Sequence, residues 1–98
     1  MRMVKHIVMF DFKDKNKKEN LIQAKAMLEE LLEHIPTLKS MEVGINFAQE
    51  ERAMDLSLYS EFEDEEGLKI YANHPKHLEA VAFIKSVASA SKVVDYRL

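Results

Sequence analysis

The chain has 98 residues, a net charge of −3 and no cysteine. This length predicts one domain over residues 1–98, and the lack of cysteine excludes disulfides, thiolate catalysis and cysteine-ligated zinc. No apolar run approaches the roughly 20 residues of a membrane span, and the charges are dispersed rather than gathered into a basic patch. We therefore expect a cytoplasmic protein that binds neither membrane nor nucleic acid.

The first half of the chain predicts a strand followed by a helix. Over residues 4–13, one strand face carries Val4, His6, Val8, Phe10 and Phe12, and the other carries Ile7 and Met9. After a charged break, apolar residues recur at helical spacing from Leu21 to Ile35. Pro36 ends this helix because proline cannot donate the next backbone hydrogen bond.

The second half predicts two strands, a divided helix and a last strand. Apolar residues alternate over 41–47 and again over 54–62, which predicts a hairpin. The acidic run 63–66 precedes a short helix, where negative side chains favour the helix dipole. A second helical piece begins at Pro75, and residues 93–96 form a short final strand.

This order of elements predicts an α+β domain with the ferredoxin-like βαββαβ plan and a split second helix. In this plan both helices cover the same face of a four-stranded antiparallel sheet. The helix-free face must also be substantially apolar, because Ile7 and Met9 lie opposite Val8 and Phe10. Since monomers rarely expose large apolar patches, we expect a homodimer that packs sheet on sheet and closes an α/β barrel.

The segment from Tyr71 to His77 gathers an aromatic hydroxyl and two imidazoles at a helix start. Pro75 suits the first helical turn and keeps His74 out of the α region, so His77 falls within that turn. The positive end of the helix dipole would hold His77 neutral, as a proton acceptor needs to be. The alternative is structural: His77 caps the helix, and Tyr71 packs with its hydroxyl bonded locally.

Other polar residues have simpler roles. His74 is expected to shape the turn before Pro75. The acidic run at 61–66 could hold a hard cation, but a solvated helix cap is the better interpretation. His74 and His77 have no third ligand at a matching spacing, so we expect no structural metal.

Four segments together resemble the stress-responsive A/B barrel (Dabb) family: His6-Ile-Val-Met-Phe-Asp-Phe-Lys13, Ile35-Pro-Thr-Leu-Lys39, Tyr71-Ala-Asn-His-Pro-Lys-His77 and Val93-Val-Asp-Tyr96. The resemblance implies a dimeric α/β barrel of ferredoxin-like type. One plant member of the family is a polyketide cyclase, and His6, Tyr71 and His77 match its strand histidine, tyrosine and helix-start histidine. A further pocket tyrosine of that cyclase is replaced here by Leu28.

Three functional hypotheses follow. The first is a homodimer whose barrel cavity binds a small apolar or aromatic molecule. The second is an enzyme of the cyclase, lyase or isomerase kind that needs no cofactor, in which His77 is the base, Tyr71 polarises a carbonyl or orients the base, and His6 contacts the substrate. The third is a structural, stress-protective protein in which side chains fill the barrel centre. A related haem-degrading family uses a tryptophan that this chain lacks, so no cofactor is expected.

Overall fold

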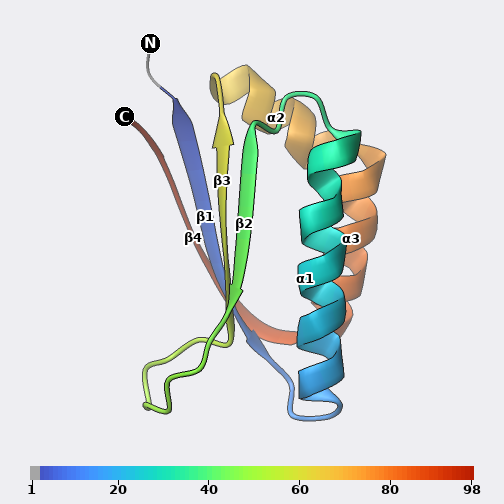
Figure 1. The fold of residues 1–98 in the computed structure, drawn as a ribbon, viewed down its shortest axis with the longest axis vertical. Coiled ribbons are helices and arrows are strands. Elements are labelled where there is room, and N and C mark those ends of the chain that lie inside the picture. The colour runs from blue at the N-terminus through green and yellow to red at the C-terminus, as the bar shows by residue number, and fades with distance from the viewer. Residues whose placement is uncertain (1–2) are drawn as a thin grey trace.

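The computed structural model describes residues 3–98, so the first two residues of the predicted domain lie outside it. Its elements are β1 (Val4–Phe12), α1 (Lys17–His34), β2 (Ser40–Ile45), β3 (Leu56–Phe62), α2 (Glu65–Asn73), α3 (Pro75–Val87) and β4 (Ala88–Arg97). The strands form one antiparallel sheet in the order β2-β3-β1-β4. All three helices lie on the same side of the sheet (Figure 1), which confirms the predicted ferredoxin-like fold.

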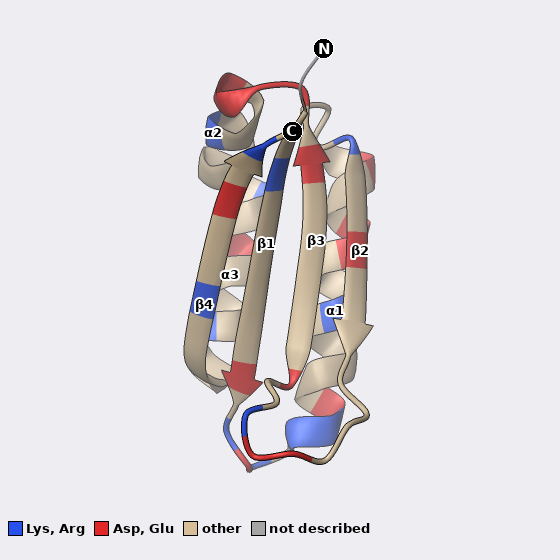
Figure 2. Cartoon of the chain, turned by 90° about the vertical axis from the view of Figure 1, so that its left-hand side faces the viewer, with Lys and Arg blue, Asp and Glu red and all other residues tan. Residues whose placement is uncertain are grey.

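Strand register divides the sheet into a helix face and an open face. Because side chains alternate along a strand, His6 shares the helix face with its neighbours Ser60 and Asp95, whereas Ile7 shares the open face with Tyr59 and Val94. The open face consists of Lys5, Ile7, Met9, Ser40, Glu42, Gly44, Ser57, Tyr59, Glu61, Lys92, Val94 and Tyr96. In Figure 2 this face is turned toward the viewer, and the middle of β1 and of β3 carries no charged residue.

The core lies between the sheet and the helices. It joins β1 and β3 to α1, and its most buried side chains include Phe62, Leu56, Leu28 and Tyr71, each no more than 2% exposed. Val8 and Phe10 are partly buried and pack against this core from the helix face of β1. The predicted apolar face of the first strand is therefore the one that the helices cover.

Helix α2 is fixed at its start. The Asp64 side chain caps it by accepting a hydrogen bond from the Gly67 amide at 2.8 Å, which confirms the helix-cap interpretation of the acidic run. The Thr37 hydroxyl, from the connection between α1 and β2, donates to the Gly67 carbonyl at 2.9 Å. A Cβ atom at Gly67 would lie 3.3 Å from the Asp64 carboxylate and 3.5 Å from the Thr37 Cβ, so glycine permits this close approach.

Element boundaries differ from the prediction at three places. Helix α1 begins at Lys17 rather than Leu21, because its polar first turn carries no apolar pattern. The hairpin strands are shorter, and residues 46–55 form a long connection. Strand β4 begins at Ala88 rather than Val93, because its extra residues are defined by backbone pairing with β1 and not by apolar side chains. Among the helices of residues 3–98, none has the length and hydropathy needed to cross a membrane.

Candidate functional site

A cleft opens between α2 and the neighbouring strands β1 and β4. Its volume is about 940 Å³. Its lining consists of Val4, His6, Glu65, Glu66, Leu68, Lys69, Ala72, Asp95, Tyr96 and Arg97. Helix α2 therefore forms one wall of the cleft, the helix wall, and β4 forms the other, the strand wall. Val4 and His6 of β1 lie between these two walls. The term "cleft" below refers to this space.

The three predicted site residues form a connected cluster, but only one of them lines the cleft. His6 is a lining residue, whereas Tyr71 and His77 are not. The rings of His6 and Tyr71 are 6.3 Å apart between centroids, and those of Tyr71 and His77 are 4.4 Å apart. Tyr71 is therefore the shared neighbour of both imidazoles. Leu28, where the cyclase has a tyrosine, lies in the core of α1 and is 2% exposed.

His6 is held by groups from both neighbouring strands. Its Nδ1 atom is hydrogen-bonded to the Asp95 carboxylate of β4, and the Ser60 hydroxyl of β3 donates to its backbone carbonyl at 3.0 Å. Since a carboxylate can only accept, Nδ1 carries the proton of this hydrogen bond, and Nε2 is the nitrogen that remains for another partner. This arrangement orients an imidazole and leaves one nitrogen free to accept a proton.

Asp95 is a candidate site residue that the sequence did not reveal. Its position in the alternating run Val93-Val94-Asp95-Tyr96 placed it on a strand face. Its partner lies 89 residues earlier in the chain, and only the register between β1 and β4 brings the two together. The sequence showed only that a single carboxylate lies at an alternating position of the predicted strand 93–96. It did not indicate which residue this carboxylate would contact.

Tyr71 is buried with an unpaired hydroxyl. The residue is 1% exposed and its ring lies 5.0 Å from that of Phe62. The hydroxyl has no hydrogen-bond partner among residues 3–98. Burial raises the pKa of Tyr71 above its ordinary value, so the phenol stays protonated as a donor. An unpaired buried donor costs about 1–3 kcal/mol, which a water or a ligand oxygen would recover.

His77 is half-buried and donates from Nδ1 to the Ala72 carbonyl at 3.0 Å, which leaves Nε2 as its acceptor. Burial lowers the pKa of His77 below its ordinary value of 6.5, and the nearby His6 and His74 lower it further. The predicted direction is correct; desolvation is the main cause, and the hydrogen bond to the Ala72 carbonyl acts in the opposite direction. At neutral pH the ring is uncharged and can accept a proton.

His74 and the acidic residues have the structural roles that the sequence indicated. The His74 side chain accepts a hydrogen bond from the Lys76 amide at 3.1 Å and so caps α3. At the mouth of the cleft, Arg97 of β4 forms an ion pair with Glu65 of α2. Within residues 3–98, no group of three histidine or acidic side chains is arranged to hold a metal ion.

The ferredoxin-like topology, with a histidine-lined cleft between the split helix and β4, places the chain in a class of small α+β barrel-forming domains. The chain belongs to the stress-responsive A/B barrel domain (Dabb) family, whose family model matches residues 4–98. It matches no curated protein sequence significantly.

Solved structures share the fold over nearly the whole chain. A dimeric ferredoxin-like protein of unknown function from Bacteroides fragilis is 33% identical, with a TM-score of 0.91, and the match covers 98% of this chain and 96% of that one. A second such dimeric protein, from Thermobifida fusca, is 25% identical with a TM-score of 0.89, covering 99% and 92%. A hydroxynitrile lyase from Passiflora edulis is 21% identical with a TM-score of 0.87, covering 98% and 93%, and resembles this chain in fold.

The cleft is not where a barrel cavity was expected. In a sheet-on-sheet dimer, the open face would line the barrel interior. The His6 side chain instead lies on the helix face, beside Ser60 and Asp95. The candidate site is therefore contained between the sheet and α2 of one protomer, because strand alternation directs His6 away from the open face.

Proposed function

We propose that this protein is a homodimer that binds a small, mainly apolar or aromatic molecule in the cleft. The main support for this proposal is the cleft. Its volume of about 940 Å³ lies within the range of small-molecule sites, which combine an apolar surface with a few oriented polar groups. Val4, Leu68 and Ala72 supply the apolar surface, and the His6–Asp95 pair supplies an oriented polar group.

The open face supports the homodimer. Met9 is 41% exposed there, Val94 51% and Tyr96 39%, and all three lie within one face of the sheet. Several exposed apolar side chains on one face of a sheet are typical of an interface. The similar structures from B. fragilis and T. fusca are described as dimeric, which favours a second copy as the partner.

A second candidate function, acid–base catalysis without a cofactor, is favoured by the unpaired hydroxyl of Tyr71. It could donate to a carbonyl oxygen, and the neutral His77 could take a proton from the adjacent carbon. This reaction class includes the cyclase, lyase and isomerase steps. An open cleft beside these groups also weighs against the third hypothesis, in which the protein has no pocket.

Thermal unfolding with small aromatic and aliphatic carbonyl compounds tests the binding proposal. We expect benzaldehyde or a similar ligand to raise the melting temperature with concentration, because it binds only the folded state. Ala72→Trp, on the cleft wall of α2, should abolish this rise by filling the cleft. Ala82→Trp, at an exposed position of α3 outside the cleft, is the matched control. An equal rise in both variants would place binding elsewhere and contradict the proposal.

A further inference from the structure

Strand β4 belongs to two surfaces at once. Asp95, Tyr96 and Arg97 form the strand wall of the cleft. Nine of the ten residues of β4 are exposed, and within residues 3–98 its only neighbouring strand is β1. The wall that carries the carboxylate partner of His6 is thus the most exposed strand of the sheet.

The two faces of β4 are linked by strand alternation. Asp95 lies on the helix face, and its neighbours Val94 and Tyr96 lie on the open face. A shift of one residue in pairing would exchange these faces and remove Asp95 from His6. Besides the ladder with β1, backbone hydrogen bonds from Lys13 to Val87 and from Leu98 to Met3 hold the two ends of this segment. A contact that covers Val94 and Tyr96 would therefore also fix Asp95.

The partner that fits the open face is a second copy of this chain. Glu42 lies on the edge strand β2 and Lys92 on the opposite edge strand β4, both exposed on the open face. Neither forms an ion pair within residues 3–98. A two-fold axis parallel to the strands places β4 of one copy over β2 of the other, so that these opposite charges approach each other.

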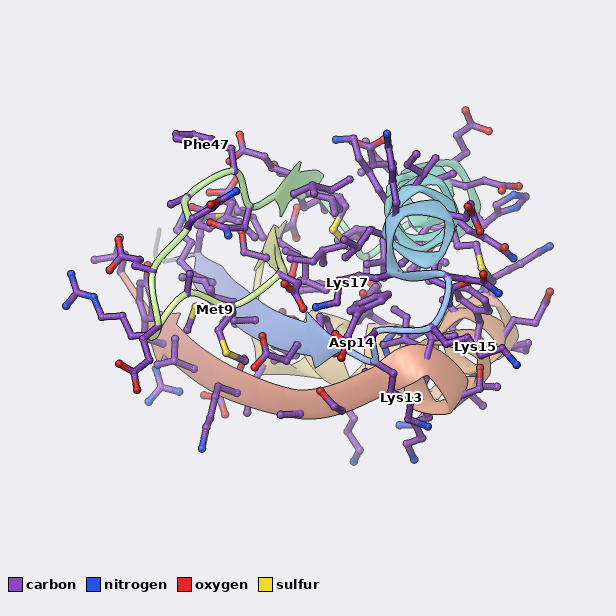
Figure 3. All side chains as sticks on the ribbon, turned by 90° about the horizontal axis from the view of Figure 1, so that it is seen from below. Met9, Lys13, Asp14, Lys15, Lys17 and Phe47 are labelled. Carbon is purple, nitrogen blue, oxygen red and sulfur yellow. The ribbon has the colours of Figure 1, made fainter. Side chains whose placement is uncertain are left out.

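The connection over residues 46–55 extends to the same side. Figure 1 shows it projecting below the sheet on the side away from the helices. Phe47, at its start, is 96% exposed, and Figure 3 shows Phe47 and Met9 on that side of the molecule. An aromatic ring this exposed gains most from burial against a partner. The connection thus continues the apolar surface beyond the edge of the sheet.

We propose that dimerisation completes the cleft: the second copy, seated on the open face, holds β4 and so keeps Asp95 and Arg97 in the cleft wall. Ligand binding and dimer formation are then coupled. The coupling to a ligand rests on the proposed function, whereas the effect of the partner on β4 does not. A dimer contact on one side of β4 stabilises the binding wall on the other side.

The test uses one interface variant and one matched control. Val94→Glu places a charge on the open face of β4, where the side chain is 51% exposed. Ile22→Glu does the same on the outer surface of α1, where the side chain is 57% exposed. We expect light scattering to show a monomer for Val94→Glu and a dimer for both Ile22→Glu and the wild type. Met9→Glu repeats the test in case Val94→Glu does not fold.

The first readout needs no ligand. In the monomeric variant, amide hydrogen exchange should become faster along β4 while the β1–β3 amides keep their protection, because β1 and β3 are the central strands and β4 is an edge strand that the partner covers. The NMR signal of the His6 Nδ1 proton should broaden or disappear as the Asp95 hydrogen bond loosens. Unchanged exchange along β4 in a monomer would overturn the proposal, and so would a dimer that survives both Val94→Glu and Met9→Glu.

The second readout is titration with benzaldehyde, followed through the His6 ring signals. We expect binding to the monomeric variant to be roughly tenfold weaker or more, within the range typical of coupled sites. By reciprocity, saturating benzaldehyde should tighten the wild-type dimer by the same factor. Equal affinity in monomer and dimer would refute the coupling. Failure of the wild-type dimer to bind benzaldehyde would instead count against the proposed function, and the exchange result would still decide whether the partner holds β4.

Discussion

The helix wall and the strand wall of the cleft differ in how the rest of the chain supports them. Helix α2 buries Gly67 and Tyr71, and Tyr71 packs between Phe62 and His77. Strand β4 buries none of its residues fully and is attached through backbone pairing with β1. One wall is fixed by side-chain packing within the protomer, and the other by hydrogen bonds at a sheet edge. A substitution should therefore have very different effects on the two walls.

The largest difference is expected from truncation. Tyr71→Ala removes a fully buried ring from the helix wall and should cost about 3–5 kcal/mol, lowering the melting temperature by more than about 10 °C. Val94→Ala on the strand wall removes a half-exposed side chain, so in a monomeric background it should change stability by less than about 0.5 kcal/mol. Denaturant unfolding measures both values. Similar losses for the two variants would contradict the contrast between the walls.

For Tyr71 of α2 and His77 of α3, the catalytic and structural interpretations predict different outcomes. For an enzyme, His77→Ala should lower turnover of a β-keto thioester by about 10²- to 10⁴-fold without unfolding the protein. Tyr71→Phe should reduce turnover by a smaller factor while leaving stability unchanged or slightly higher, because the hydroxyl it removes is unpaired. Circular dichroism is the fold control. If the wild type has no turnover and His77→Ala only lowers the melting temperature, the histidine has a structural role through its hydrogen bond to the Ala72 carbonyl.

The pH dependence of stability should originate at His77 of α3, next to the helix wall. The pKa of His77 is lower in the folded state than its unfolded value of 6.5, so the unfolded chain binds more protons. The free energy of unfolding should therefore fall as the pH is lowered from 7 to 5. The pKa of Glu61 is also lowered, but from 4.5, so its contribution is lost only at more acidic pH. His77→Gln should flatten the pH 7 to 5 slope, and an unchanged slope would assign it to other groups.

The smallest effect concerns the strand wall and its partner. Lys92→Glu and Glu42→Lys should each weaken the dimer by a few fold, because exposed ion pairs contribute about 0.2–1 kcal/mol. The double variant should recover the wild-type dissociation constant if β4 faces β2 of the partner. Sedimentation at several ionic strengths measures the dimer dissociation constant of each variant. Additive weakening in the double variant would show that the two strands do not meet.

The sequence predicts the helix wall better than the strand wall, for a physical reason. Local sequence patterns predict the helix wall and the start of α3 that follows it: the acidic cap, the spacing of Tyr71 and His77, and the proline at 75 all lie within a few residues of one another. The strand wall depends on register, because Asp95 reaches His6 only through the β1–β4 ladder. Its first five residues, Ala-Ser-Ala-Ser-Lys, alternate only small side chains and no large apolar ones, so the sequence predicts only the end of β4. The position of the cleft, on the helix face rather than in a barrel interior, likewise follows from side-chain direction within the assembled sheet.

Gly67 influences the cleft although it lies outside the lining. It is the residue at which the first turn of α2 approaches Thr37, whose hydroxyl donates to the Gly67 carbonyl. The Cβ atom of any larger residue would lie 3.3 Å from the carboxylate of Asp64, so that capping side chain would have to move by a few tenths of an ångström. Because Asp64 caps the helix that contributes Glu65 and Glu66 to the lining, a substitution at this one position can alter the cleft without replacing any residue that lines it.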